Sequence, residues 1–265
     1  DPDHLDIYGD ADEMTKSYLA FIHKTDPEGQ ILLHKDVSSK LGADLLRKHR
    51  TYGLEGAQIT ANNIRVEASK FVFDYVGAVE IKNLHLALPG FHNVENALAA
   101  ITAALDRGVG PDFIKEAIES YRGVKRRFEF ILDRSDLVYI DDYAHHPNEI
   151  AALLKSAKKL YPEKKITVVF QPHLFSRTRD FYQEFAEKLS LADEVIMLDI
   201  YPAREQPIPG VDAHLILDRI TQVNKKMASL NEFPTILNAS NVEVLLTVGA
   251  GSIDTLVPII KSFYT

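Results

Sequence analysis

The chain has no cysteine, which excludes disulfide bonds, thiolate metal sites and cysteine nucleophiles. It has no apolar run long enough to cross a bilayer, and its start lacks the basic and then apolar pattern of a signal peptide. Positive charge is also scarce, because 30 Lys and Arg stand against 38 Asp and Glu, and the basic cluster Lys125–Arg127 is short. A surface that follows nucleic-acid phosphates needs far more clustered cations. We therefore expect a cytoplasmic protein that binds neither nucleic acid nor membranes.

Hydrophobic residues make up 46% of the 265 residues and charged residues 26%, a balance typical of ordinary soluble globular proteins. This length is comfortable for two domains, and it allows a sizeable core. The chain opens on DPDHLDIYGD, without an initiator Met, so we expect that it starts inside a longer protein.

Helix and strand signals follow one another in the first half of the chain. Apolar spacing predicts a helix over 11–24, which an Asp-Pro pair ends, and a strand over 31–34. The alternation of apolar and polar residues over 58–88 predicts a short antiparallel meander. Two further helices are predicted, one over 92–107 that a glycine closes and one over 111–121 that a proline opens.

From Leu137 onward, apolar runs alternate with helix signals. Strands are predicted over 137–140, 166–170, 194–198 and 243–248, with helices after Pro147, Ser176, Val211 and Gly251. Such alternation predicts an α/β fold with a doubly wound, mostly parallel sheet covered on both faces. We place the domain boundary near Gly123, with one domain at 1–123 and the other at 124–265. Ligands of such a sheet gather beyond the carboxyl ends of its strands.

Two strand ends carry many ionisable side chains. The segment VYIDDYAHHPNEI ends a buried strand with two acids, a tyrosine and two histidines, more than packing requires. Singly, Asp141 or His146 could equally be a helix cap, but as a group these residues favour a ligand site. The next strand ends in FQPHLFSRTRDF, which places His173, Arg177 and Arg179 at a helix start that attracts anions. Arg177 suits a carboxylate or phosphate clamp, whereas an ion pair with a nearby acid accounts better for Arg179.

Two weaker signals stay open between function and packing. In GFHNVENALAA, His92, Asn93 and Asn96 lie at a helix start, and Asn amides can both donate to and accept from an adenine edge. As a single residue, Asn93 could equally cap the helix. The GAGSI turn after LLTV resembles the turn of a dinucleotide site, but close backbone packing explains a short glycine pair as well.

The chain resembles the second half of the UDP-N-acetylmuramate–L-alanine ligase family of bacterial Mur ligases. The matching segments, in order, are DPDHLDIYGD, LPGFHNVENALAA, YRGVKRRFEF, DDYAHHPNE, FQPHLFSRTRDF, YPAREQPIPG and GAGSI. The resemblance implies the end of a central ATPase domain followed by a Rossmann-like C-terminal domain. It also implies that an N-terminal UDP-sugar domain and a GTHGKT-type phosphate loop lie upstream. Leu174 departs from the pattern, since some relatives carry a second Arg there.

The resemblance implies an ATP-dependent ligase of peptidoglycan synthesis. The lactyl carboxylate of UDP-N-acetylmuramate is phosphorylated by ATP, the amine of L-alanine attacks the acyl phosphate, and ADP and phosphate leave. Catalysis of this kind is mostly positioning and neutralisation of charge by Mg²⁺ and cationic side chains. The implied cofactors are ATP and Mg²⁺, and the implied partners are the two substrates and the N-terminal domains of the same protein.

By motif match, the resemblance also implies site residues. His4 corresponds to a magnesium ligand, and Asn93 and Asn96 correspond to adenine-facing positions. Arg127 and Asp142 correspond to contacts with the phosphate and ribose of the nucleotide. The substrate-facing positions are Tyr143, His145, His173 and Arg177, and the catalytic positions are Arg127, His145 and Arg177.

Three other interpretations stay open. A murein-peptide ligase has the same fold and attaches a tripeptide to the same sugar nucleotide, although FQPHLFSRTRDF differs from the sequence expected of that enzyme. A metal-dependent hydrolase would use a two-metal site made of His4, Asp141, Asp142, His145 and His146. A non-catalytic module would bind adenine nucleotides without turnover, and we expect this chain alone to be inactive.

Overall fold

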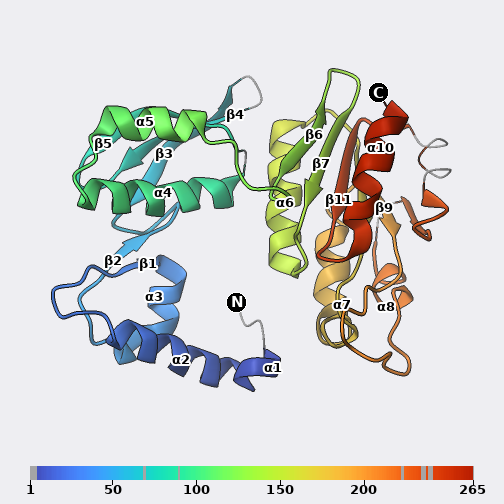
Figure 1. Ribbon diagram of the computed structural model, residues 1–265, viewed down its shortest axis with the longest axis horizontal. Coiled ribbons are helices and arrows are strands. Elements are labelled where there is room, and N and C mark those ends of the chain that lie inside the picture. Colours follow the sequence, from blue (N-terminus) through green and yellow to red (C-terminus); the bar gives the residue numbers. More distant parts are fainter. Residues whose placement is uncertain are drawn as a thin grey trace. The chain divides into compact units, whose positions relative to one another are not determined.

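The computed structural model describes residues 5–67, 70–88, 90–221, 224–233, 237 and 241–264. These residues form two compact units (Figure 1). The first unit holds most residues up to Tyr121, and the second begins at Arg122 and also takes in short segments around Lys70 and Leu88. We keep residue 123 as the proposed limit between the two domains.

The first unit begins with helices and a two-stranded sheet. Its elements are α1 (Leu5–Tyr8), α2 (Ala11–His23), β1 (Leu32–His34), α3 (Lys35–Leu41), the 3₁₀ helix η1 (Gly42–Asp44) and β2 (Arg50–Tyr52). The strands β1 and β2 pair in parallel. The Asp10 carboxylate accepts a hydrogen bond of 2.8 Å from the Glu13 amide and so caps α2 at the predicted helix start. The predicted helix and strand are confirmed, whereas α3 and β2 are too short to produce a periodic signal.

A three-stranded sheet and two helices complete the first unit. They are β3 (Thr60–Glu67), β4 (Lys70–Val76), β5 (Glu80–Leu86), α4 (Phe91–Asp106) and α5 (Pro111–Ser120). The sheet order is β3-β4-β5, and β4 and β5 are antiparallel, so the predicted meander is confirmed. The Tyr75 hydroxyl on β4 lies 3.0 Å from the Thr102 hydroxyl on α4. This buried hydrogen bond fastens the helix to the sheet.

The second unit contains a six-stranded sheet. In chain order its elements are β6 (Glu129–Asp133), β7 (Val138–Asp142), α6 (Pro147–Leu160), β8 (Ile166–Phe170), α7 (Phe175–Leu189), β9 (Glu194–Met197), α8 (His214–Leu217), β10 (Asn224–Met227), β11 (Val244–Val248), the 3₁₀ helix η2 (Ser252–Thr255) and α10 (Leu256–Tyr264). The strand order is β10-β9-β8-β11-β7-β6. Every pair is parallel except β6 with β7, which confirms the predicted parallel-dominated α/β sheet.

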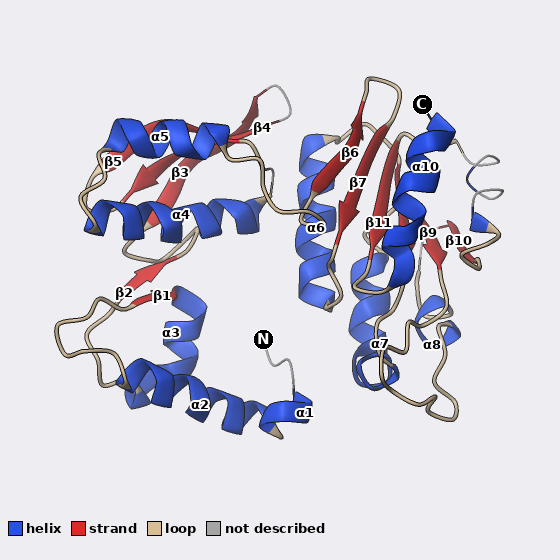
Figure 2. Cartoon of the chain, in the orientation of Figure 1, coloured by secondary structure: helices blue, strands red, loops and turns tan. Residues whose placement is uncertain are grey.

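Both faces of this sheet are covered. On one face, Tyr139 packs with Leu256 and Ile260 of α10. On the other face, the Phe170 ring lies 5.5 Å from the Phe185 ring on α7. In Figure 2, α10 lies in front of the strands, and α6 and α7 lie behind them. Burial on both faces is the reason why these strands are continuous apolar runs rather than alternating ones.

The structure departs from the predicted elements at the sheet edges, where β6 and β10 were not predicted. The helices predicted after Val211 and Gly251 are confirmed: the four-residue helix α8 follows Val211, and the helix after Gly251 begins as η2 before it continues as α10. The edge strand β6 contains the short apolar run Phe130–Leu132, whereas β10 has the sequence NKKM and no such run. Lysines on an edge strand discourage pairing with other chains. They also interrupt the apolar pattern from which a strand can be predicted.

The order of the strands creates a crossover beside β7. The chain leaves β7, passes through α6 and returns at β8, and β11 occupies the space between these two strands. The carboxyl ends of β7, β11 and β8 therefore meet at one edge. Open parallel sheets bind ligands at such an edge.

Candidate functional site

Asp141 is the centre of a buried polar network at the end of β7. Its carboxylate accepts hydrogen bonds from the Thr247 hydroxyl on β11, at 2.6 Å, and from Nε of Arg126, at 3.1 Å. The Thr247 hydroxyl also lies 3.1 Å from the Tyr139 hydroxyl. Burial raises the pKa of Asp141, although the bonds from Thr247 and Arg126 act against this rise. The network joins two central strands to the loop before β6.

Asp142, on the opposite face of β7, accepts hydrogen bonds from backbone amides. Phe128 donates to one carboxylate oxygen at 2.7 Å, and Ala144 donates to the other at 2.8 Å. Burial raises the pKa of Asp142 to about 6 despite these two bonds. The carboxylate therefore fastens the loop before β6 to the loop after β7. Each oxygen can still accept a second hydrogen bond, so the ribose contact of Asp142 stays a prediction.

Tyr143 packs against two arginines of the basic cluster. The guanidinium carbons of Arg126 and Arg127 lie 4.9 Å and 5.7 Å from the centroid of its ring, which are cation–π distances. The two arginines differ in exposure, since the side chain of Arg126 is 19% exposed and that of Arg127 is 53% exposed. Arg127 makes one long ion pair, 3.9 Å from Glu149. Arg127 is therefore the arginine that a ligand can reach.

His145 is oriented by its own loop. Its Nδ1 lies 2.9 Å from the Tyr143 carbonyl, and since a carbonyl only accepts, Nδ1 carries the proton of the neutral ring and Nε2 is the basic nitrogen. The His145 amide donates to Glu149 at 2.9 Å. His146, by contrast, caps α6, because its Nδ1 accepts from the Asn148 amide at 3.3 Å. Capping thus accounts for His146, and His145 remains the site candidate.

His173 and Arg177 follow the carboxyl end of β8. The His173 ring stacks on Tyr201 with 5.8 Å between centroids and lies 6.1 Å from the His145 ring. One terminal nitrogen of Arg177 lies 3.4 Å from Nδ1 of His173. The structure therefore brings together, along one edge of the sheet, a set that we call the strand-end row: Arg127, Tyr143, His145, His173 and Arg177.

The start of α7 is already occupied by a carboxylate of the chain. Glu205 accepts hydrogen bonds from the Ser176 hydroxyl and, at 3.0 Å, from the Ser176 amide. Burial works to raise the pKa of Glu205, but the bonds from Ser176 outweigh it and the pKa is lowered. The anion at this helix start is therefore a carboxylate of the chain itself, that of Glu205. Arg179 pairs with Asp180 at 2.7 Å, as predicted.

Packing explains the glycine pair of the GAGSI turn. A Cβ at Gly249, where φ is +147°, would lie 2.6 Å from the Gln171 carbonyl oxygen, and a Cβ at Gly251 would lie 2.6 Å from Cβ of Tyr201. The Gln171 side chain, in turn, accepts from the Ile253 amide at 2.9 Å. The turn after β11 therefore presses against the loop after β8, and only glycine fits. Of the two explanations left open by the sequence, the structure favours packing.

The remaining predicted residues lie elsewhere. Asn93 and Asn96 lie on the first turns of α4 in the first unit, Asn93 half-buried and Asn96 exposed. Their contact with adenine stays a prediction. His4 lies outside the described residues. The motif match gave no role to Arg126, which looks like its neighbour Arg127 in the sequence. It gave none to Thr247 either, which is a lone hydroxyl residue within an apolar strand.

A metal site is not evident in the described part of the chain. No group of three or more His, Asp or Glu side chains there is arranged to hold a metal ion. Asp141 and Asp142 are adjacent on one strand and point to opposite faces of the sheet, so they cannot share a metal. The two-metal hydrolase interpretation therefore finds no support among these residues.

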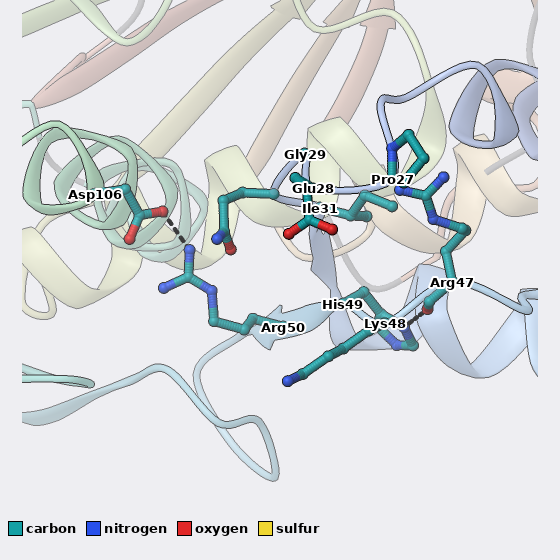
Figure 3. A pocket seen from close by; sticks show the side chains of 10 residues that line it. Pro27, Glu28, Gly29, Ile31, Arg47, Lys48, His49, Arg50 and Asp106 are labelled. Atoms are coloured by element: carbon teal, nitrogen blue, oxygen red, sulfur yellow. Dashed lines mark hydrogen bonds and ion pairs between the residues drawn. The ribbon is translucent and has the colours of Figure 1, made fainter.

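A cavity of about 430 Å³ lies in the first unit (Figure 3). Its lining residues with ionisable side chains are Glu28, Arg47, Lys48, His49, Arg50 and Asp106. Arg47 donates to the carbonyls of Thr25 and Asp26, at 2.8 Å and 2.6 Å, and Arg50 pairs with Asp106 on α4. Both arginines thus hold parts of the fold together. The strand-end row remains the better candidate for ligand binding.

Two family models match the chain. One, described as Mur ligase middle domain, matches residues 1–104, and the other, described as Mur ligase, glutamate ligase domain, matches residues 126–253. The UDP-N-acetylmuramate–L-alanine ligase of Phocaeicola vulgatus is 44% identical over 97% of this chain and 57% of its own length. That of Cytophaga hutchinsonii is 43% identical over 98% of this chain and 56% of its own length. The chain therefore spans little more than half the length of these relatives.

Solved structures resemble the chain over nearly its whole length. The UDP-N-acetylmuramate-alanine ligase of Thermotoga maritima matches with a TM-score of 0.76 at 29% identity, over 99% of this chain and 57% of that one. A murein peptide ligase of Psychrobacter arcticus matches with a TM-score of 0.63 at 19% identity, over 95% of this chain and 54% of that one. At 19% identity, the second match shows similarity of fold alone.

Proposed function

Because the chain belongs to the Mur ligase family, we propose that the protein of which it is a part joins L-alanine to UDP-N-acetylmuramate in an ATP-dependent step of peptidoglycan precursor synthesis. The observation that carries this proposal is the name shared by relatives that are 41% to 44% identical across almost the whole chain. The strand-end row supports it, since it offers guanidinium and imidazole groups to an anionic sugar nucleotide.

The chemistry needs positioning and cationic side chains more than covalent help from the protein. The lactyl carboxylate takes the γ-phosphoryl group of ATP, and the amine of L-alanine then displaces phosphate from the resulting acyl phosphate. Arg177 is the proposed clamp for the carboxylate or the transferring group, because its planar fork binds two oxygens. His145 is the proposed base for the proton that the amine loses.

The remaining residues of the row bind and orient. Arg127, 53% exposed, reaches the nucleotide phosphates. Tyr143 and His173 present ring faces and edges to the substrate. Asp142 contacts the ribose, and it also holds the loop before β6 to the loop after β7.

The adenine and magnesium contacts are proposed from motif match. Asn93 and Asn96 face adenine from the start of α4. His4, which lies outside the described part of the chain, serves as a ligand of Mg²⁺. One structural neighbour, the ligase MurF of Thermotoga maritima, is 15% identical to this chain and was solved in complex with ADP.

The protein is proposed to work in the cytoplasm, together with the N-terminal domains of the same polypeptide and without nucleic acid or membrane partners. Within the described ranges, no helix is long and apolar enough to span a bilayer.

Two rival functions are separated by substrate and turnover. A murein-peptide ligase would prefer a ready-made tripeptide to L-alanine as the amine substrate. A binding module would bind adenine nucleotide and release no phosphate. No observation favours either rival over the alanine ligase.

The test is phosphate release by a full-length protein that carries this chain, supplied with ATP, Mg²⁺ and UDP-N-acetylmuramate. We expect release to require L-alanine and to be far slower with the tripeptide. Release that depends on the tripeptide instead would favour the murein-peptide ligase, and release without either amine acceptor would contradict ligation.

A further inference from the structure

The side chain of Arg126 contacts several parts of the second unit beside the strand-end row. Its Nε donates to Asp141 at 3.1 Å, one terminal nitrogen donates to the Gly249 carbonyl, and the other lies 3.6 Å from the Asp254 carboxylate. Its guanidinium carbon lies 4.9 Å from the centroid of the Tyr143 ring. One side chain thus joins the end of β7, the loop after β7, the turn after β11 and the helix η2.

The backbone of Arg126 is held as well. Its amide donates to the Glu129 carboxylate at 2.8 Å, and its carbonyl accepts from the Tyr143 amide at 2.7 Å. Its φ of +58° lies in the left-handed region, which residues other than glycine adopt only where their surroundings hold them. Tyr143 therefore meets both the backbone and the side chain of the same arginine.

The neighbouring Arg127 shows the opposite arrangement, with a half-exposed side chain and one long ion pair. We propose that Arg126 is a positioning residue, which places Tyr143 in the strand-end row and leaves Arg127 to meet the ligand. This proposal rests on the proposed ligase function. It assigns different work to two adjacent arginines that look alike in the sequence.

The geometry requires the fork of an arginine. Nε and a terminal nitrogen of Arg126 point to Asp141 and to Gly249 at the same time. A lysine at this position keeps the charge, but its single ammonium cannot reach both acceptors with the same directions. Arg126→Lys therefore removes the positioning while it leaves a cation beside the buried carboxylate of Asp141.

The test is a double-mutant cycle in the full-length protein between Arg126→Lys and Tyr143→Ala, with kcat and KM measured for each substrate. If Arg126 acts through Tyr143, Arg126→Lys should lower kcat/KM for UDP-N-acetylmuramate at least tenfold in the parent, but less than threefold in the Tyr143→Ala background. A purely structural role predicts the same loss in both backgrounds, because the two effects would then be independent. Equal losses, or no loss in the parent, would overturn the proposal.

Arg134→Lys is the matched control. Arg134 also pairs with an aspartate, Asp136, but it is exposed and lies beside the start of β7, at the opposite edge of the sheet. Its replacement should change kcat/KM by less than twofold. An equal loss in Arg134→Lys would mean that any Arg–Asp pair of this unit matters, and the positioning proposal would fall.

A crystal structure separates this inference from the ligase function. In Arg126→Lys, the Tyr143 ring should leave its place beside residue 126, whatever reaction the protein performs. If the parent protein releases no phosphate, the ligase function fails, and the position of the ring still decides the inference. An unmoved ring would refute positioning even in an active ligase.

Discussion

Arg177 can be a clamp for a ligand or one half of a surface contact, and the two roles differ in magnitude. An exposed ion pair is worth at most about 1 kcal/mol, whereas a charge-assisted contact in the transition state is worth about 2–4 kcal/mol. In the full-length ligase we expect Arg177→Ala to lower kcat/KM tens- to hundreds-fold, and Arg177→Lys to fail almost as badly because an ammonium lacks the fork. Kinetics with UDP-N-acetylmuramate and a thermal melt measure both effects.

Arg179→Ala is the control on the same helix, since Arg179 is exposed and pairs with its neighbour Asp180 at the surface. Its kcat/KM and melting temperature should stay close to those of the parent. An Arg177→Ala variant that melts early and keeps its kcat/KM would contradict the clamp and move the substrate away from this turn.

Asp142 makes the stability of the second unit depend on pH. Its pKa is raised from 3.8 to about 6 by burial, so between these values the folded chain holds a proton that the unfolded chain has lost. Stability relative to Asp142→Asn should therefore fall as the pH rises from about 4 to about 6, by at most about 3 kcal/mol. Urea titrations of the two proteins across this range measure the difference.

Asp136→Asn is the matched control, because the hydrogen bond from Arg134 lowers the pKa of Asp136 to about 2. Its difference from the parent should hardly vary between about pH 5 and pH 7. A flat difference for Asp142→Asn over pH 4 to 6 would mean that the buried carboxylate is ionised throughout.

At the scale of elements, the glycine pair decides how the turn after β11 packs. Gly249→Ala would bring a Cβ to 2.6 Å from the Gln171 carbonyl oxygen at a φ of +147°. We expect a loss of about 2–5 kcal/mol in the free energy of unfolding, since left-handed strain costs roughly 1–2 kcal/mol and overpacking roughly 1–3 kcal/mol. Gly210→Ala, at φ +78° with nothing within 4 Å of its Cβ, should lose only the strain. Equal losses in the two variants, measured by urea unfolding, would rule out the packing contact.

Elements with a strong local pattern were predictable, and those defined by their neighbours were not. The helix α2 has a capping aspartate and an apolar face, and β7, β8 and β11 are uniformly buried runs. The strand β10 has the sequence NKKM and is defined by its pairing with β9, so its own residues carry little signal. The strand β6 was not predicted, although it contains the short apolar run Phe130–Leu132. The helix expected after Val211 is present as α8, which has four residues.

At the scale of the whole molecule, the 265-residue chain by itself should neither ligate alanine nor hydrolyse ATP at a measurable rate. No GTHGKT-type segment occurs in its sequence, so the backbone amides and lysine that hold the β- and γ-phosphates are missing. Phosphate release assays on this chain and on the full-length protein, at equal concentration, measure the contrast. Alanine-dependent release by the chain alone would show that the phosphate loop is dispensable.

The sequence by itself determined the alternation of strands and helices, the family, and the placement of most of the strand-end row. These features depend on residues that are close together in the chain, where periodicity and motif spacing can be read directly. Only the tertiary structure decided that Arg126 is largely enclosed while Arg127 is exposed, and that Asp142 accepts hydrogen bonds from two amides. It also decided that the glycine pair serves packing. The physical reason is distance along the chain, because Arg126 and the Gly249 carbonyl are 123 positions apart, and Asp141 and Thr247 are 106 positions apart.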